Sequence, residues 1–164
     1  MDFHDPLVKR MASFLREIGL AIEPGAVPGP SFLPGIAVRH GALVIDEEHL
    51  SYPGDVLHEA GHLAVVPPLR RVALHENVGN DGAEEMMAIA WSYAAALHLG
   101  IEPEIVFHEA GYRGGASSLR ENFQEGRYLA LPMLQWVGMA FDPKRSQQEN
   151  VAPYPHMIRW LREA

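Results

Sequence analysis

The clearest chemical pattern in the sequence is a pair of histidines four residues apart, with a glutamate beside the first. His58 and His62 have this spacing, and on a helix their imidazoles project from one face and can share a metal ion. Glu59 lies one step further round the helix, where its carboxylate can reach a metal-bound water without binding the metal. The chain has no cysteine, so a metal must be bound by histidine or carboxylate side chains. The pattern predicts a zinc site with Glu59 as general base; the alternative is an ordinary helix with two surface histidines.

A catalytic zinc ion typically has three protein ligands and one open position, so a third ligand is required. Residues 63–68 read Leu-Ala-Val-Val-Pro-Pro, where a metzincin would continue with Gly and then His, and this excludes that subclass. Glu84 and Glu85 both fall in the first turn of a predicted Ala-rich helix. With Asp81 as N-cap, Glu84 completes a capping box, which leaves Glu85 free to face the histidines. Glu85 is therefore the predicted third ligand.

Three further histidines and a tyrosine are candidates for the same site. His75, His98 and His108 are reserve ligands, although a lone histidine is more often an ordinary surface or core residue. A peptidase also benefits from a donor aimed at the oxyanion of the tetrahedral intermediate. His108 and Tyr112 are the predicted donors, because they lie in a glycine-flanked segment and such segments often line sites. The alternative role for each is packing.

The elements that must position these residues follow from apolar periodicity and from Pro and Gly. The N-terminal part is expected to hold an amphipathic helix, a Pro- and Gly-rich surface loop and a β-hairpin, at residues 5–18, 23–35 and 36–45. Gly41 can supply the positive φ of the hairpin turn. Asp55 is expected to cap the helix that carries the two histidines, and Pro67-Pro68 to end it.

The second half of the chain is expected to be helical. A helix from about 80 to 99 is capped by Asp81 and followed by Gly100. Shorter helices or apolar segments are expected at 103–108, 117–125, 129–141, where Pro132 interrupts the pattern, and 155–162. Aromatic side chains at helical spacing usually belong to the core, and this places Trp91, Trp136 and Trp160 there.

The His58–His62 motif and Glu85 together resemble a known class of enzymes. His-Glu-Ala-Gly-His, followed some twenty residues later by a Glu on a second helix, resembles the gluzincin branch of zinc metallopeptidases. The compact ImmA/IrrE-type peptidases are similar in the spacing of Glu85, Ala88, Trp91 and Ser92. The resemblance covers about residues 42–99. It implies an α+β, zincin-like fold and zinc-dependent hydrolysis of peptide bonds, with the two histidines and Glu85 as ligands and Glu59 as base.

Length and charge limit the other possibilities. The 164 residues suit one domain, 1–164, that can bury a core without a metal or disulfide. The formal net charge of -8 makes nucleic acid an unfavourable partner. No apolar run is long enough to span a membrane and the N-terminus lacks the pattern of a signal peptide, so a cytoplasmic protein is expected.

Two functions are consistent with these features. The first is a cytoplasmic zinc peptidase whose substrate is a peptide or protein, bound in extended form along the edge of the strand at 42–45. The second is a non-catalytic regulatory or binding module that keeps the zincin metal site. In either case the apolar segment 129–141 could provide the surface for a homo-oligomer.

Overall fold

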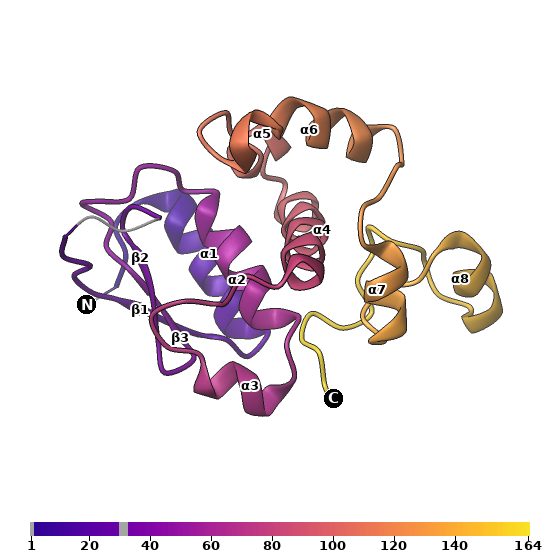
Figure 1. The fold of residues 1–164 in the computed structure, drawn as a ribbon, viewed down its shortest axis with the longest axis horizontal. Coiled ribbons are helices and arrows are strands. Elements are labelled where there is room, and N and C mark those ends of the chain that lie inside the picture. The colour runs from indigo at the N-terminus through magenta and orange to yellow at the C-terminus, as the bar shows by residue number, and fades with distance from the viewer. Residues whose placement is uncertain (1, 30–32) are drawn as a thin grey trace.

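The protein has an α+β fold in a computed structural model that describes residues 2–29 and 33–164 (Figure 1). The strands are β1 (Ala21–Pro24), β2 (Ile36–Arg39) and β3 (Ala42–Ile45). The helices are α1 (Pro6–Glu17), α2 (Asp55–Ala64), α3 (Pro68–Ala73), α4 (Gly82–Leu99), α5 (Pro103–Val106), the 3-10 turn η1 (Tyr112–Gly114), α6 (Ala116–Gln124), α7 (Leu131–Trp136) and α8 (Pro143–Glu149). The α+β class expected from the sequence is confirmed.

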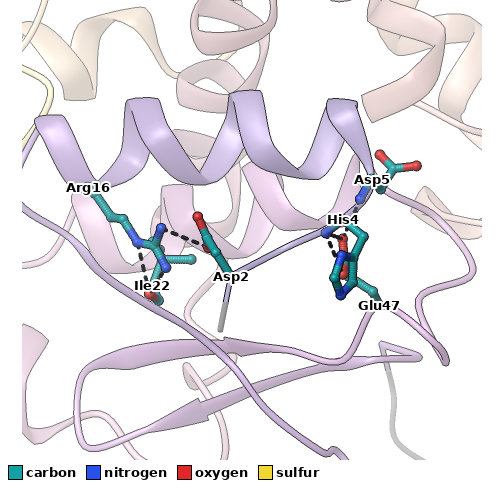
Figure 2. Close-up of polar contacts among 6 residues, drawn as sticks. All are labelled: Asp2, His4, Asp5, Arg16, Ile22 and Glu47. Carbon is teal, nitrogen blue, oxygen red and sulfur yellow. Dashed lines mark hydrogen bonds and ion pairs between the residues drawn. The ribbon is translucent and has the colours of Figure 1, made fainter.

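Helix α1 begins at the N-cap that its sequence predicts, and hydrogen bonds join both of its ends to the strands or to the residues that follow them. The Asp5 side chain accepts two N–H groups of the first turn, which is the usual role of an N-cap. Figure 2 shows the Glu47 carboxylate accepting the backbone N–H groups of His4 and Asp5, at 2.9 Å each. At the other end of α1, the Arg16 guanidinium donates to the carbonyl of Ile22 in β1. The helix is therefore held at both ends.

The sheet has the order β1-β3-β2, so that β3 is the central strand. It pairs in parallel with β1 and in antiparallel with β2, and all four of its residues are buried. The predicted hairpin is confirmed, with His40 and Gly41 both at positive φ in the turn. The expectation that β3 offers an edge to a peptide is wrong, because both of its edges are already hydrogen-bonded.

The two strands at the edges of the sheet are themselves partly covered. The carbonyl of Ile22 in β1 is occupied by Arg16, and that of Val38 in β2 accepts the backbone N–H of Glu76 at 2.7 Å. Such contacts protect edge strands from further pairing. The strand β1 was not predicted: its last two residues belong to the stretch 23–35 that was expected to be loop, of which 30–32 lie outside the described residues.

Helix α4 runs through the middle of the molecule, with the sheet on one side of it and α7 and α8 on the other in the view of Figure 1. It has 18 residues, its N-cap is Asp81, and Gly100 follows it in the left-handed conformation, as predicted. Trp91 of α4 is fully buried, and its indole N–H donates to the carbonyl of Trp160 at 2.9 Å. Within the described ranges no helix is long and apolar enough to cross a membrane.

Several predictions for the second half are wrong in detail. Trp136 is 90% exposed at the end of α7 rather than in the core. Pro132 stands in the first turn of α7, where proline is tolerated, instead of interrupting a longer helix. The helices α3 and α8 were not predicted. Residues 155–162 form turns and bends, not a helix, because the tail is held by long-range contacts: Tyr154 donates to the carbonyl of Ala90, and the N–H of Arg162 donates to that of Ala64.

The C-terminal end of α2 is closed by an arginine side chain from α3. The Arg71 guanidinium donates to four backbone carbonyls at 2.7 to 3.3 Å, those of Leu63, Ala64, Val66 and Arg162. Carbonyls in the last turn of a helix have no partner within the helix, and a cation there also opposes the negative end of the helix dipole. Arg71 therefore joins α2, α3 and the C-terminal tail.

We expect Arg71→Met to lower the free energy of unfolding by about 2–3 kcal/mol, since it removes the charged donor from several half-buried carbonyls but keeps the apolar stem. Urea unfolding followed by circular dichroism measures this. Arg127→Met is the control, because Arg127 pairs with Glu125 at an exposed position and such a pair contributes at most about 1 kcal/mol. Equal losses in the two variants would contradict the capping role of Arg71.

Candidate metal centre

Helix α2 begins at a close contact with α5, not at a side-chain cap. Its N-cap is Gly54, and a Cβ atom added there would lie 1.9 Å from the carbonyl oxygen of Ile105, so only glycine fits. The prediction that Asp55 caps the helix is wrong. Asp55 is the first helical residue, and its buried carboxylate instead accepts a hydrogen bond from His108 Nε2 at 2.6 Å.

Close packing of α2 against α4 brings the two halves of the site together. Gly61, between the two histidines, lies over Ala88 of α4: a Cβ atom on Gly61 would be 2.9 Å from the Ala88 carbonyl oxygen and 3.3 Å from its Cβ. Ala88 is one turn after Glu85 on the same helix. The small residues at this crossing allow the helices to approach closely enough for Glu85 to reach the imidazoles of α2.

The three predicted metal ligands lie together. His58 Nε2 is 3.2 Å from one carboxylate oxygen of Glu85, and His62 Nε2 is 2.7 Å from the other. One possible ligand atom from each residue lies within 4.8 Å of the other two, and the imidazole rings are nearly perpendicular, at 85°. The hydrogen bonds from His58 and His62 hold the pKa of Glu85 well below its usual range. The carboxylate is therefore ionised, as a metal ligand must be.

These residues fit a divalent zinc ion in their chemistry. Two imidazole nitrogens and one carboxylate oxygen form one of the common ligand sets of catalytic zinc. The side chains of His58 and His62 are only 12% and 7% exposed, whereas that of Glu85 is 46% exposed. Solvent, and a substrate, would thus reach the group from the side of Glu85. Among the described residues, this is the one cluster of three or more potential ligands.

Glu59, the predicted base, is buried next to the ligand cluster on α2. It is 6% exposed, and burial is the main cause of its raised pKa, which the neighbouring His62 and His58 oppose. A raised pKa makes a carboxyl group better suited to take up a proton and release it again near neutral pH. This is the property that a general base and subsequent acid requires.

Glu84 and Glu85 point in different directions, as the capping argument predicted, but Glu84 has a different partner. Asp81 accepts the backbone N–H of Glu84 at 2.9 Å. The Glu84 carboxylate does not complete a capping box among the described contacts; it forms a two-pronged ion pair with Arg70 of α3. Glu84 is therefore occupied away from the histidines.

The reserve ligands lie outside the cluster. The rings of His75 and His40 stack at 4.0 Å near the hairpin turn. His98 packs against both Phe14 and Trp160. The imidazoles of His75 and His98 are therefore engaged in packing contacts.

Of the two predicted oxyanion donors, Tyr112 contacts the cluster, whereas His108 contacts the first residue of α2. The Tyr112 hydroxyl is 3.4 Å from His58 Nδ1. His108 is bonded to Asp55 and has Tyr52 stacked on its ring, with centroids 4.3 Å apart and planes at 7°. Sequence reasoning missed Asp55 and Tyr52 as partners of His108, and no local pattern could have revealed pairs more than 50 residues apart. Donation to an oxyanion stays a prediction for both His108 and Tyr112.

We expect Gly61→Ala to weaken both folding and metal binding, because the added methyl group would push α2 away from α4. The cost of such overpacking is typically about 1–3 kcal/mol. Urea unfolding and zinc competition with a chromophoric chelator measure the two effects. Gly82→Ala is the matched control, since no heavy atom lies within 4 Å of its added Cβ and alanine favours helix. The same behaviour in both variants would show that the crossing does not set the ligand spacing.

No family model matches the chain, and neither a curated protein nor a solved structure does. The likeness to gluzincins therefore rests on the residues quoted above, and membership of that class stays a prediction. Function depends on the residues of a site more than on the fold that carries them.

Proposed function

We propose that the protein is a zinc-dependent hydrolase of peptide or related amide bonds. His58, His62 and Glu85 would bind the zinc ion, and Glu59 would act as general base. The observation that carries the proposal is the contact of the Nε2 atoms of His58 and His62 with the Glu85 carboxylate, at 3.2 and 2.7 Å. The buried Glu59 lies beside this contact, on the helix that carries the two histidines. A general base next to a three-ligand group is the arrangement of hydrolytic zinc sites.

Zinc, when bound, supplies a lowered pKa for a coordinated water and polarisation of the scissile carbonyl. The chain's own residues do the rest. Glu59 accepts a proton from the attacking water through its carboxylate and then delivers that proton to the leaving nitrogen. The buried surroundings of Glu59 exclude bulk water, which strengthens these interactions.

The second candidate is a cytoplasmic regulatory module in which metal binding serves folding alone. A structural zinc site closes its fourth position with another protein ligand, whereas the described residues offer three in this group. Among the described residues, Glu59 is buried beside the ligands and forms no hydrogen bond with them. A module that uses the metal only for folding gives this carboxylate no function. These two features favour the hydrolase.

The test begins with protein purified without chelators. Elemental analysis is expected to find about one zinc per chain, since this ligand set with an open position suits that metal. Digestion of a peptide library, read by mass spectrometry, is expected to yield cleavage products that disappear when a chelator is added. Stoichiometric zinc without cleavage would favour the regulatory module, and an absence of bound zinc would contradict the metal site itself.

A further inference from the structure

Two contacts join the segment 107–114 to the active-site helix α2. His108 Nε2 donates to Asp55 at 2.6 Å, at the first residue of α2. Four residues further along the segment, the Tyr112 hydroxyl lies 3.4 Å from His58 Nδ1, and the two rings meet edge to face with centroids 5.5 Å apart. The first contact fixes the segment on the helix, and the second places a phenol against a metal-ligand candidate.

The His108 ring is held in one orientation by contacts on several sides. Tyr52 stacks on the ring, and Gly111 also lies close, since a Cβ atom there would be 3.1 Å from His108 Cε1. Its Nε2 donates a hydrogen bond to Asp55, while Nδ1 is buried without a partner among the described residues. The geometry thus makes His108 an anchor for the segment.

The backbone of Tyr112 adopts a strained conformation. Its φ of 58° is in the left-handed region, which is uncommon for residues other than glycine and costs free energy. Such strain persists where the surroundings impose it, and here the anchor is His108, four residues earlier.

The nitrogen that Tyr112 contacts is the one that does not face Glu85. His58 Nε2 is 3.2 Å from Glu85, so this is the nitrogen directed at the ligand cluster. A neutral histidine that binds a metal through Nε2 carries its proton on Nδ1, and a partner for that N–H fixes both tautomer and ring orientation. The phenol oxygen of Tyr112 can accept this hydrogen bond.

We propose that Tyr112 is a positioning residue that accepts the Nδ1–H of His58, holds its Nε2 toward the metal site, and is itself kept in place by the Asp55–His108 pair. The inference rests on the proposed function only in taking His58 as a zinc ligand. It assigns Tyr112 a role different from oxyanion donation, because its hydroxyl lies on the side of His58 opposite the nitrogen that faces Glu85.

The test compares Tyr112→Phe with Tyr52→Phe. Both lose one hydroxyl from neighbouring aromatic residues, but the Tyr52 hydroxyl has no recorded partner among the described residues. Competition with a chromophoric chelator is expected to show zinc binding weakened about 10- to 100-fold in Tyr112→Phe, the usual range for the partner of a ligand histidine, and unchanged in Tyr52→Phe. In the zinc-bound protein, NMR is expected to show the His58 Nδ1–H proton exchanging slowly with water, and exchanging faster in Tyr112→Phe.

The outcomes separate this inference from the proposed function. Wild-type protein that binds zinc, with Tyr112→Phe of equal affinity and an unchanged exchange rate of the His58 Nδ1–H proton, would overturn the positioning role alone. Equal affinity with a lower kcat would also overturn it and assign Tyr112 to the oxyanion. Wild-type protein that binds no zinc would overturn both. If Tyr112→Phe lowers the thermal stability of the protein, the exchange rate of the His58 Nδ1–H proton, measured in the zinc-bound protein below the unfolding temperature, still decides the question.

Discussion

Glu59→Gln is expected to keep its zinc and to lose roughly 10²- to 10⁴-fold in kcat, the range typical for removal of a general base. The amide has the shape of the carboxylate but cannot accept the proton of the attacking water. His58, His62 and Glu85 are untouched, so the three side chains that contact each other in the cluster remain available to the metal. Elemental analysis and the rate of cleavage of a substrate found in the peptide library measure the two effects.

Stability provides an independent check on this variant. Because burial raises the pKa of Glu59, the ionised carboxylate is less favourable in the folded protein than in the unfolded chain, and a neutral amide removes that cost. Glu59→Gln is therefore expected to unfold at a temperature no lower than the wild type. Glu84→Gln is the control, since it alters another buried glutamate that pairs with Arg70 instead of facing the histidines. Normal activity in Glu59→Gln would refute the mechanism.

Glu85→Ala is expected to release zinc, with an affinity loss above the roughly 100-fold that marks the upper range for residues that only support a ligand. The variant removes the carboxylate that touches both Nε2 atoms and leaves two ligands. Glu84→Ala should keep its metal, because that carboxylate pairs with Arg70. Glu84→Ala is instead expected to lower the free energy of unfolding, because it removes the ion pair and a buried side chain.

Zinc competition and thermal unfolding with and without metal measure both variants together. Added zinc is expected to raise the unfolding temperature of Glu84→Ala and not that of Glu85→Ala, since only a bound ligand stabilises the folded state. If Glu84→Ala loses the metal and Glu85→Ala retains it, the two roles are exchanged. If both retain it, the third ligand lies elsewhere in the chain.

Local sequence determined the elements on which the site depends. Asp81 and Gly100 delimit α4 because caps act through neighbouring backbone groups, and His40-Gly41 close the hairpin because that turn needs two residues at positive φ. The four-residue spacing of His58 and His62 puts both imidazoles on one helix face. The choice of Glu85 over Glu84 rested on a capping box that the Glu84 carboxylate does not form, since it pairs with Arg70.

Tertiary structure alone decided the partners of these residues. Asp55 is a good helix cap by type, but it begins α2 against α5 and binds His108, 53 positions away. Glu84 satisfies its carboxylate with Arg70 rather than with its own helix end. The apolar pattern of 129–141 could not reveal that Trp136 would be solvent-exposed, since periodicity identifies a face without identifying what covers it.

The order of the strands in the sheet and the conformation of the C-terminal tail could not be predicted from local sequence either. Strand β3 is central only because β1 and β2 pair on either side of it, and a strand's neighbours depend on the path of the whole chain. Residues 155–162 stay non-helical because Arg162 and Trp160 satisfy the backbone and side chains of α2 and α4. Short-range hydrogen bonds and periodicity thus determined which helix carries the histidines, whereas long-range packing determined what surrounds them.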